Sequence, residues 1–155
     1  MATNKGMTFY VSKTPQPQDM ALIEFEALTD WVKVSLVSEV GESGTNTNIV
    51  GLDTMDTEFT QKGKGISNAG DFTLTCKLKT GDAGQELMSD LALTNMNYAF
   101  KRVWNDQLTT GGTGTTIYDR GIIVGPLIAG GGPEDFPTRT WTCGFQQRCV
   151  EVPAT

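Results

Sequence analysis

The stretch Asp71–Lys79, with the sequence DFTLTCKLK, decides the fold class of this chain. Its apolar side chains occupy every second position and alternate with polar ones, which is the period of a strand with one buried and one solvated face. In the following TGDAGQEL, Asp82 is a favourable helix N-cap and Gln85 comes three residues later, as in a capping box. Apolar residues then recur at helical spacing. We therefore expect a strand followed by a helix over about 82–94.

Alternating apolar and polar residues recur on both sides of this unit. Such runs occupy residues 21–27, 32–40, 98–104, 116–124 and 138–150. Glycine-rich turns separate the last three runs from one another. These patterns predict a mainly β fold, namely a β-sandwich or rolled β-barrel of six or seven strands with one flanking α-helix.

Two segments do not fit this alternation. Residues 1–20 are polar and contain TPQPQ, whose two prolines favour extended backbone outside a central strand. Residues 41–66 are rich in Gly, Ser, Thr, Asn and charge, and are longer than most loops of compact domains. We expect an extended N-terminal arm over 1–20 and a single domain over 21–155, with a long loop or hairpin over about 41–66.

The composition excludes several classes of function. The 155 residues carry a net charge of −6, whereas a protein that holds nucleic acid needs a basic surface. The chain has no histidine, so it lacks the commonest general base and metal ligand. No run reaches the roughly 18–20 apolar residues of a membrane span, and the first residues lack the apolar core of a signal peptide. We expect a cytoplasmic product that is not an enzyme and needs no cofactor, metal or membrane.

Three cysteines, an odd number, do not make a closed disulfide framework. Cys76, Cys143 and Cys149 each fall on the apolar side of an expected strand, where a free cysteine packs as a small apolar residue. If Cys143 and Cys149 shared one strand, they would lie ~20 Å apart, too far for a disulfide. A bond from Cys149 to another subunit stays open as an alternative.

The polar segment over 41–66 contains an acidic group and a glycine-rich group. Asp53, Asp56 and Glu58 lack the spacing and the central glycine of an EF-hand, so a solvated acidic surface explains them better than a calcium site. The run KGKG at 62–65 does not complete a phosphate-binding loop and is typical of a turn.

From about residue 51 to residue 150, the order of these elements resembles that of the tail tube proteins, or major tail proteins, of long-tailed bacteriophages. The resemblance rests on the Gly-Lys-Gly excursion, NAGDFTLT at 68–75, TGDAGQEL at 80–87, YAFK at 98–101, and a late glycine-rich turn into a Thr-rich strand. It implies a β-sandwich subunit that forms hexameric rings, stacked into a hollow tube through which genomic DNA is ejected. It also implies other tail proteins at the tube ends, assembly in the host cytoplasm, a place in the virion tail, and no catalytic residues.

An acidic chain suits such a conduit, because a basic lumen would hold the phosphates of the passing DNA. DNA would then pass without specific binding. The acids that we expect to face the lumen are Asp53, Asp56, Glu58, Glu24 and Glu26.

Three alternatives stay open. A tube protein of a contractile injection or type VI secretion system would pass effectors instead of DNA. A monomeric β-sandwich binding module would use Trp31, Trp104 and Trp141 as its platform, although aromatic residues in alternating strands are more often core or interface. An enzyme that uses carboxylates alone has no acidic pair at a recognisable spacing.

Overall fold

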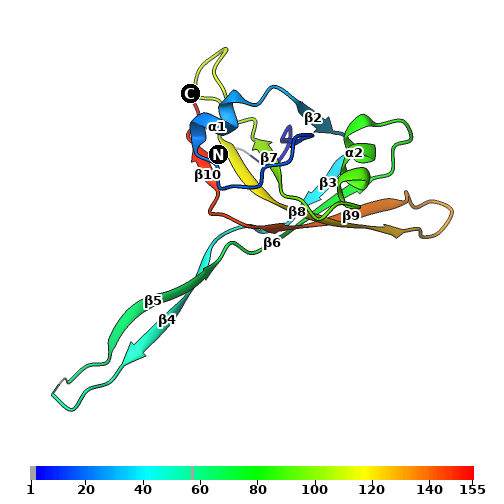
Figure 1. Cartoon of the computed structure of the whole chain (residues 1–155). Helices are drawn as coiled ribbons and strands as arrows, with labels where there is room; N and C mark the ends of the chain where they lie inside the picture. Colours follow the sequence, from blue (N-terminus) through cyan, green and yellow to red (C-terminus); the bar gives the residue numbers. More distant parts are fainter. Residues whose placement is uncertain (1–2, 57) are drawn as a thin grey trace.

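Strands dominate the chain in the computed structural model, which describes residues 3–56 and 58–155 (Figure 1). In those residues the elements are β1 (Thr8–Ser12), α1 (Leu22–Ala27), β2 (Trp31–Val34), β3 (Val37–Val40), β4 (Asn46–Leu52), β5 (Gln61–Asn68), β6 (Asp71–Lys77), α2 (Ala83–Leu91), β7 (Tyr98–Val103), β8 (Thr116–Ala129), β9 (Thr138–Phe145) and β10 (Val150–Val152). The mainly β class and the helix expected over 82–94 are confirmed. The ten strands of this part exceed the six or seven expected, because β1 was not expected, the hairpin adds β4 and β5, and the runs at 32–40 and 138–150 each form two strands.

Eight of these strands form one antiparallel sheet in the order β2-β1-β7-β8-β9-β6-β3, with β10 paired to β8. The long β8 changes partner along its length: residues 116–121 pair with β7, and the residues from Gly121 on pair with β9 across an irregularity between Val124 and Leu127. The strands β2 and β3 lie at the two ends of this order, yet only Ser35 and Leu36 connect them. This short link brings the two ends together, so the sheet is rolled around its core.

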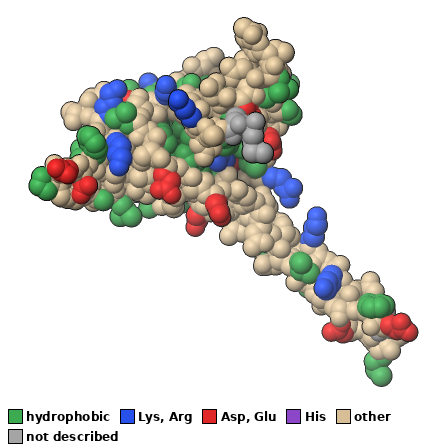
Figure 2. Space-filling model, turned by 180° about the vertical axis from the view of Figure 1, so that it is seen from behind, with side chains coloured by type: hydrophobic (Ala, Val, Ile, Leu, Met, Phe, Trp, Pro, Cys, Tyr) green, Lys and Arg blue, Asp and Glu red, His purple; other side chains and the backbone are tan. Residues whose placement is uncertain are grey.

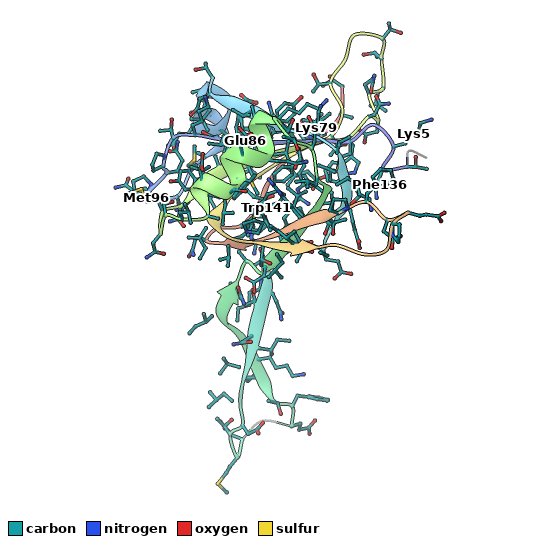
Figure 3. All side chains as sticks on the ribbon, turned by 90° about the vertical axis from the view of Figure 1, so that its right-hand side faces the viewer. Lys5, Lys79, Glu86, Met96, Phe136 and Trp141 are labelled. Atoms are coloured by element: carbon teal, nitrogen blue, oxygen red, sulfur yellow. The ribbon has the colours of Figure 1, made fainter. Side chains whose placement is uncertain are left out.

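Aromatic rings fill the inside of the rolled sheet. The Phe72 ring stacks on Phe9 at 6.0 Å and on Phe145 at 5.6 Å, and Trp141 is fully buried beside them (Figure 3). Met88 and Leu91 of α2 join this cluster from one end of the sheet. The apolar face predicted for residues 71–79 is confirmed, since Phe72, Leu74 and Cys76 are all fully buried.

Residues 21–27, expected to be a strand, form the short helix α1. Phe25 is the buried residue of this helix and stacks on Tyr118 at 5.2 Å, whereas Ile23 is 79% exposed. One buried aromatic residue anchors the segment, and six residues are too few for their spacing to separate a helix from a strand. The described residues thus contain two helices, α1 and α2, and the expectation of a single helix is wrong.

The expectation of an extended arm over 1–20 is also wrong. β1 lies inside the sheet, where it pairs with β2 on one side and β7 on the other, and its Phe9 and Val11 are fully buried. The prolines follow this strand, and the segment after them is fixed to the body by the ion pair between Asp19 and Arg120 at 2.6 Å. Most of this segment belongs to the core domain.

The strand expected over 138–150 is divided in two. β9 ends at Phe145, and β10 then pairs with β8 beyond a connection that contains Cys149. Cys143 is buried in the core, Cys149 is half-buried, and both are free thiols. The premise that these two cysteines share a strand is therefore wrong. Burial raises the pKa of the Cys76 thiol to about 12, and it also raises that of Cys143, as expected for cysteines that pack in a core.

Candidate assembly surfaces

The segment expected as a loop or hairpin over 41–66 forms the hairpin of β4 and β5, which projects from the body (Figure 1). Its two strands pair only with each other, from Asn46 opposite Asn68 to Leu52 opposite Gln61. The hydroxyls of Thr47 and Ser67 lie 2.7 Å apart across the hairpin near its base. Backbone pairing thus holds the hairpin together without a core of its own.

Large apolar side chains along this hairpin are exposed. They are Ile49, Val50, Leu52, Met55, Phe59 and Ile66. Met55 at the tip is 107% exposed, and no side chain that the structure describes on the hairpin is buried. Such a concentration of exposed large apolar side chains on one element is typical of a site of interaction between proteins.

A buried ion pair ties the base of the hairpin to the core. Arg102 of β7 and Asp119 of β8 lie 2.9 Å apart with side chains 5% and 1% exposed. The Arg102 guanidinium also donates a 2.7 Å hydrogen bond to the Ser43 hydroxyl and lies 4.8 Å from the Phe72 ring centre. Burial raises the pKa of Asp119, against the opposing effect of the adjacent Arg102. The connection before β4 is therefore anchored where the hairpin leaves the body.

The five acids predicted to face a lumen fall into two separate groups. Asp53, Asp56 and Glu58 lie at the tip of the hairpin, whereas Glu24 and Glu26 lie on α1, and all five are exposed (Figures 1 and 2). Glu24 and Glu26 therefore project from a helix, whereas we expected them on the face of a strand. Whether either group lines a lumen stays a prediction.

An open pocket of about 380 Å³ lies beside the link between β2 and β3. Its apolar lining includes Met7, Leu36 and Val37, and its charged lining residues are Lys33 and Lys79. Leu36 is 51% exposed and has a positive φ of 57°, a conformation that a leucine adopts only when its surroundings impose it.

The N-terminus of α2 imposes this shape on the link. The Asp82 carboxylate accepts hydrogen bonds from the N–H groups of Ser35, at 3.2 Å, and Gln85, at 3.0 Å. The fully buried Gln85 amide donates to the carbonyls of Ser35 and Lys77 and accepts from the Lys79 N–H at 3.2 Å. A Cβ on Gly84 would collide with the Lys33 carbonyl. The DAGQ motif found in the sequence therefore clamps both segments that carry the pocket lysines.

The three tryptophans do not make one binding platform. Trp141 is enclosed in the core, while Trp31 lies half-buried beside Tyr118 and Trp104 donates to Asn4 at 3.2 Å. This arrangement removes the tryptophan platform that we expected for a monomeric β-sandwich binding module.

A metal-binding cluster and a membrane-spanning helix are both absent from the part of the chain that the structure describes. Within residues 3–56 and 58–155, no three His, Cys, Asp or Glu side chains are grouped so that they could hold a metal ion. In the same residues, neither helix has the length and apolar character to cross a membrane.

Comparison with known proteins identifies the fold. No family model and no curated protein matches the sequence. Among solved structures, a chain of the SPP1 tail tube superposes with a TM-score of 0.67 and 14% identity, over 95% of this chain and 76% of that chain. A chain of the anti-feeding prophage (AFP) baseplate gives a TM-score of 0.61 and 10% identity, over 96% and 92%. The resemblance seen in the sequence is thus confirmed at the level of the fold, which this chain shares with the SPP1 tail tube chain.

Proposed function

We propose that this chain is a virion structural protein, the subunit of a phage tail tube. Copies assemble into hexameric rings, the rings stack into a hollow tube, other tail proteins bind the tube ends, and genomic DNA leaves through the lumen. The fold shared with the SPP1 tail tube chain supports the proposal. The six-fold symmetry named for the AFP baseplate structure supports six copies in a ring.

The single observation that carries self-assembly is the uncovered β4–β5 hairpin. A hairpin of two strands is marginally stable in water, and its exposed apolar side chains add a cost of hydration. Contact with another copy removes apolar surface from water at roughly 25 cal/mol per Å². Rings or tubes therefore supply the partner that the single chain lacks.

An acidic lumen is part of this proposal. The chain carries a net charge of −6, and several copies around a pore multiply any charge that faces inward. Repulsion acts on DNA only near the wall, since the Debye length is about 8 Å at physiological salt. The exposed Glu24 and Glu26 of α1 and the three acids of the hairpin tip are the candidates, and DNA passes without being held.

A tube of a contractile injection or type VI secretion system is the second candidate, favoured by the similarity to the AFP baseplate chain. The material that passes through the tube distinguishes this candidate from a phage tail. Particles that contain this chain and also hold a genome support the phage tail, whereas particles that hold proteins and no genome support the injection system.

Sedimentation velocity over a range of concentrations tests the assembly itself. We expect large species that grow with concentration for the natural chain. The matched control replaces residues 46–68 with Gly-Gly between Thr45 and Ala69, and this variant should remain a monomer. A natural chain that stays monomeric at every concentration would contradict the proposal and favour a binding module.

A further inference from the structure

The hairpin tip combines apolar and acidic side chains. Met55 and Phe59 are 107% and 79% exposed, and Asp53, Asp56 and Glu58 lie among them. Figure 2 shows hydrophobic and acidic side chains together at the far end of the hairpin, with basic side chains closer to the body. A surface that receives this tip must offer both an apolar contact and positive charge.

The pocket beside the β2–β3 link offers this combination. Its lining contains Met7, Leu36 and Val37 as apolar contacts and the exposed Lys33 and Lys79 as cations. Asp82 is close enough to Lys79 for the lysine to help lower the pKa of this carboxyl, but Asp82 is buried and caps α2. Both lysines therefore remain exposed for contact with another molecule.

The position of the pocket makes the contact one between copies. Lys79 lies in the part of the body away from the hairpin (Figure 3). A tip at one end and a pocket at the other cannot meet within one chain. A contact between two different surfaces of identical copies is heterologous, and it gives a closed ring or an open-ended stack according to whether the rotation between copies closes.

We propose that the acidic, apolar tip of the β4–β5 hairpin docks into the Lys33–Lys79 pocket of a second copy of this chain. The inference rests on the proposed function and adds the surface that receives the hairpin. It assigns Asp53, Asp56 and Glu58 to contacts between copies, which leaves Glu24 and Glu26 as candidates for the lumen. It also gives the DAGQ motif a role, because Asp82 and Gln85 fix the segments that carry both lysines.

Charge reversal tests this contact. Lys33→Glu with Lys79→Glu should abolish assembly at the concentration at which the natural chain assembles, while circular dichroism shows that the variant is still folded. Adding Asp53→Lys, Asp56→Lys and Glu58→Lys to the same chain should restore assembly, because all charges across the contact are then exchanged. Lys13→Glu, an exposed change elsewhere on the body, is the matched control and should assemble normally.

Zero-length carbodiimide cross-linking of the assembled natural chain provides a second measurement. We expect amide links between Lys33 or Lys79 and the acids at 53, 56 or 58, found by mass spectrometry only in assembled material. The docking inference is wrong, and the tube proposal stands, if the natural chain and the double lysine variant both assemble. The same conclusion follows if the cross-links of the assembled natural chain join other surfaces. If the natural chain never assembles, both are wrong.

Discussion

In the body, Phe72 of β6 is fully buried between Phe9 and Phe145, whereas on the hairpin Ile49 and Phe59 are 73% and 79% exposed. Both regions consist of paired antiparallel strands. The difference lies in what covers them, since the body rolls its sheet around a core and the hairpin has only solvent beside it. The comparison indicates that the body carries the stability of the single chain and the hairpin carries its association.

Deletion of each region should give the largest contrast. Removal of residues 1–18 takes away β1, which pairs with two strands and contributes Phe9 and Val11 to the core. Because a domain of this size is stable by only about 5–15 kcal/mol, we expect the truncated chain to be unfolded by circular dichroism. Replacement of residues 46–68 by Gly-Gly should leave the melting temperature nearly unchanged. A chain that folds without β1 would contradict the view that the rolled sheet of the body carries the stability.

Phenylalanine truncation should separate the two regions at the level of one side chain. Phe72→Ala should lower the free energy of unfolding by about 4 kcal/mol, because it leaves a cavity in a packed core. Phe59→Ala should change it by no more than about 0.5 kcal/mol while weakening assembly. Urea unfolding measures the first effect and sedimentation the second. Equal stability losses in the two variants would show that the hairpin is packed in solution.

The clamp at the start of α2 should have an intermediate effect. Gln85→Leu removes the partners of the Ser35 and Lys77 carbonyls and of the Lys79 N–H. Unsatisfied buried groups cost about 1–3 kcal/mol each, and since these three hydrogen bonds are only partly buried we expect a total loss of about 3 kcal/mol. Urea unfolding of this variant, with Glu86→Leu on the exposed side of α2 as control, tests the assignment. A loss no larger than that of the control would contradict it.

The smallest expected effect concerns pH. Burial acts to raise the pKa of Asp82, but hydrogen bonds from Ser35 and the Gln85 N–H, together with nearby Lys79, lower it below the ordinary 3.8. A carboxyl whose pKa is lowered by folding stabilises the fold at every pH above its pKa in the unfolded chain. This contribution is lost as the pH falls through its pKa in the folded chain. The stability difference between the natural chain and Asp82→Asn should therefore shrink below about pH 3.8. A difference that stays constant down to pH 2 would contradict this role.

The sequence predicted the parts of the fold that have long, regular patterns. The run at 71–79, the N-cap at Asp82 and the hairpin segment were recognised because alternation and capping are local properties. The interior position of β1 was missed, since five residues with only two buried apolar side chains, close to prolines, give too short a pattern. The helix α1 was missed because the contact that buries Phe25, with Tyr118, joins residues far apart in the sequence.

The candidate surfaces were predicted less well than the fold. Acidic residues can be counted in a sequence, but their separation into a hairpin-tip group and an α1 group depends on tertiary arrangement. The pocket was not predicted at all, because it forms only where Lys33, Leu36 and Lys79 meet across the ends of the rolled sheet. The DAGQ motif was its one visible signal, and it was interpreted as a helix start and as part of the family resemblance, not as a feature of a pocket.

Negative-stain electron microscopy of the concentrated natural chain tests the central claim most directly. The account predicts rings and hollow tubes in which the hairpin of each copy is covered by a neighbour, and it predicts their absence in the variant without residues 46–68. Single compact particles for the natural chain at every concentration, or tubes that form equally well without the hairpin, would contradict it.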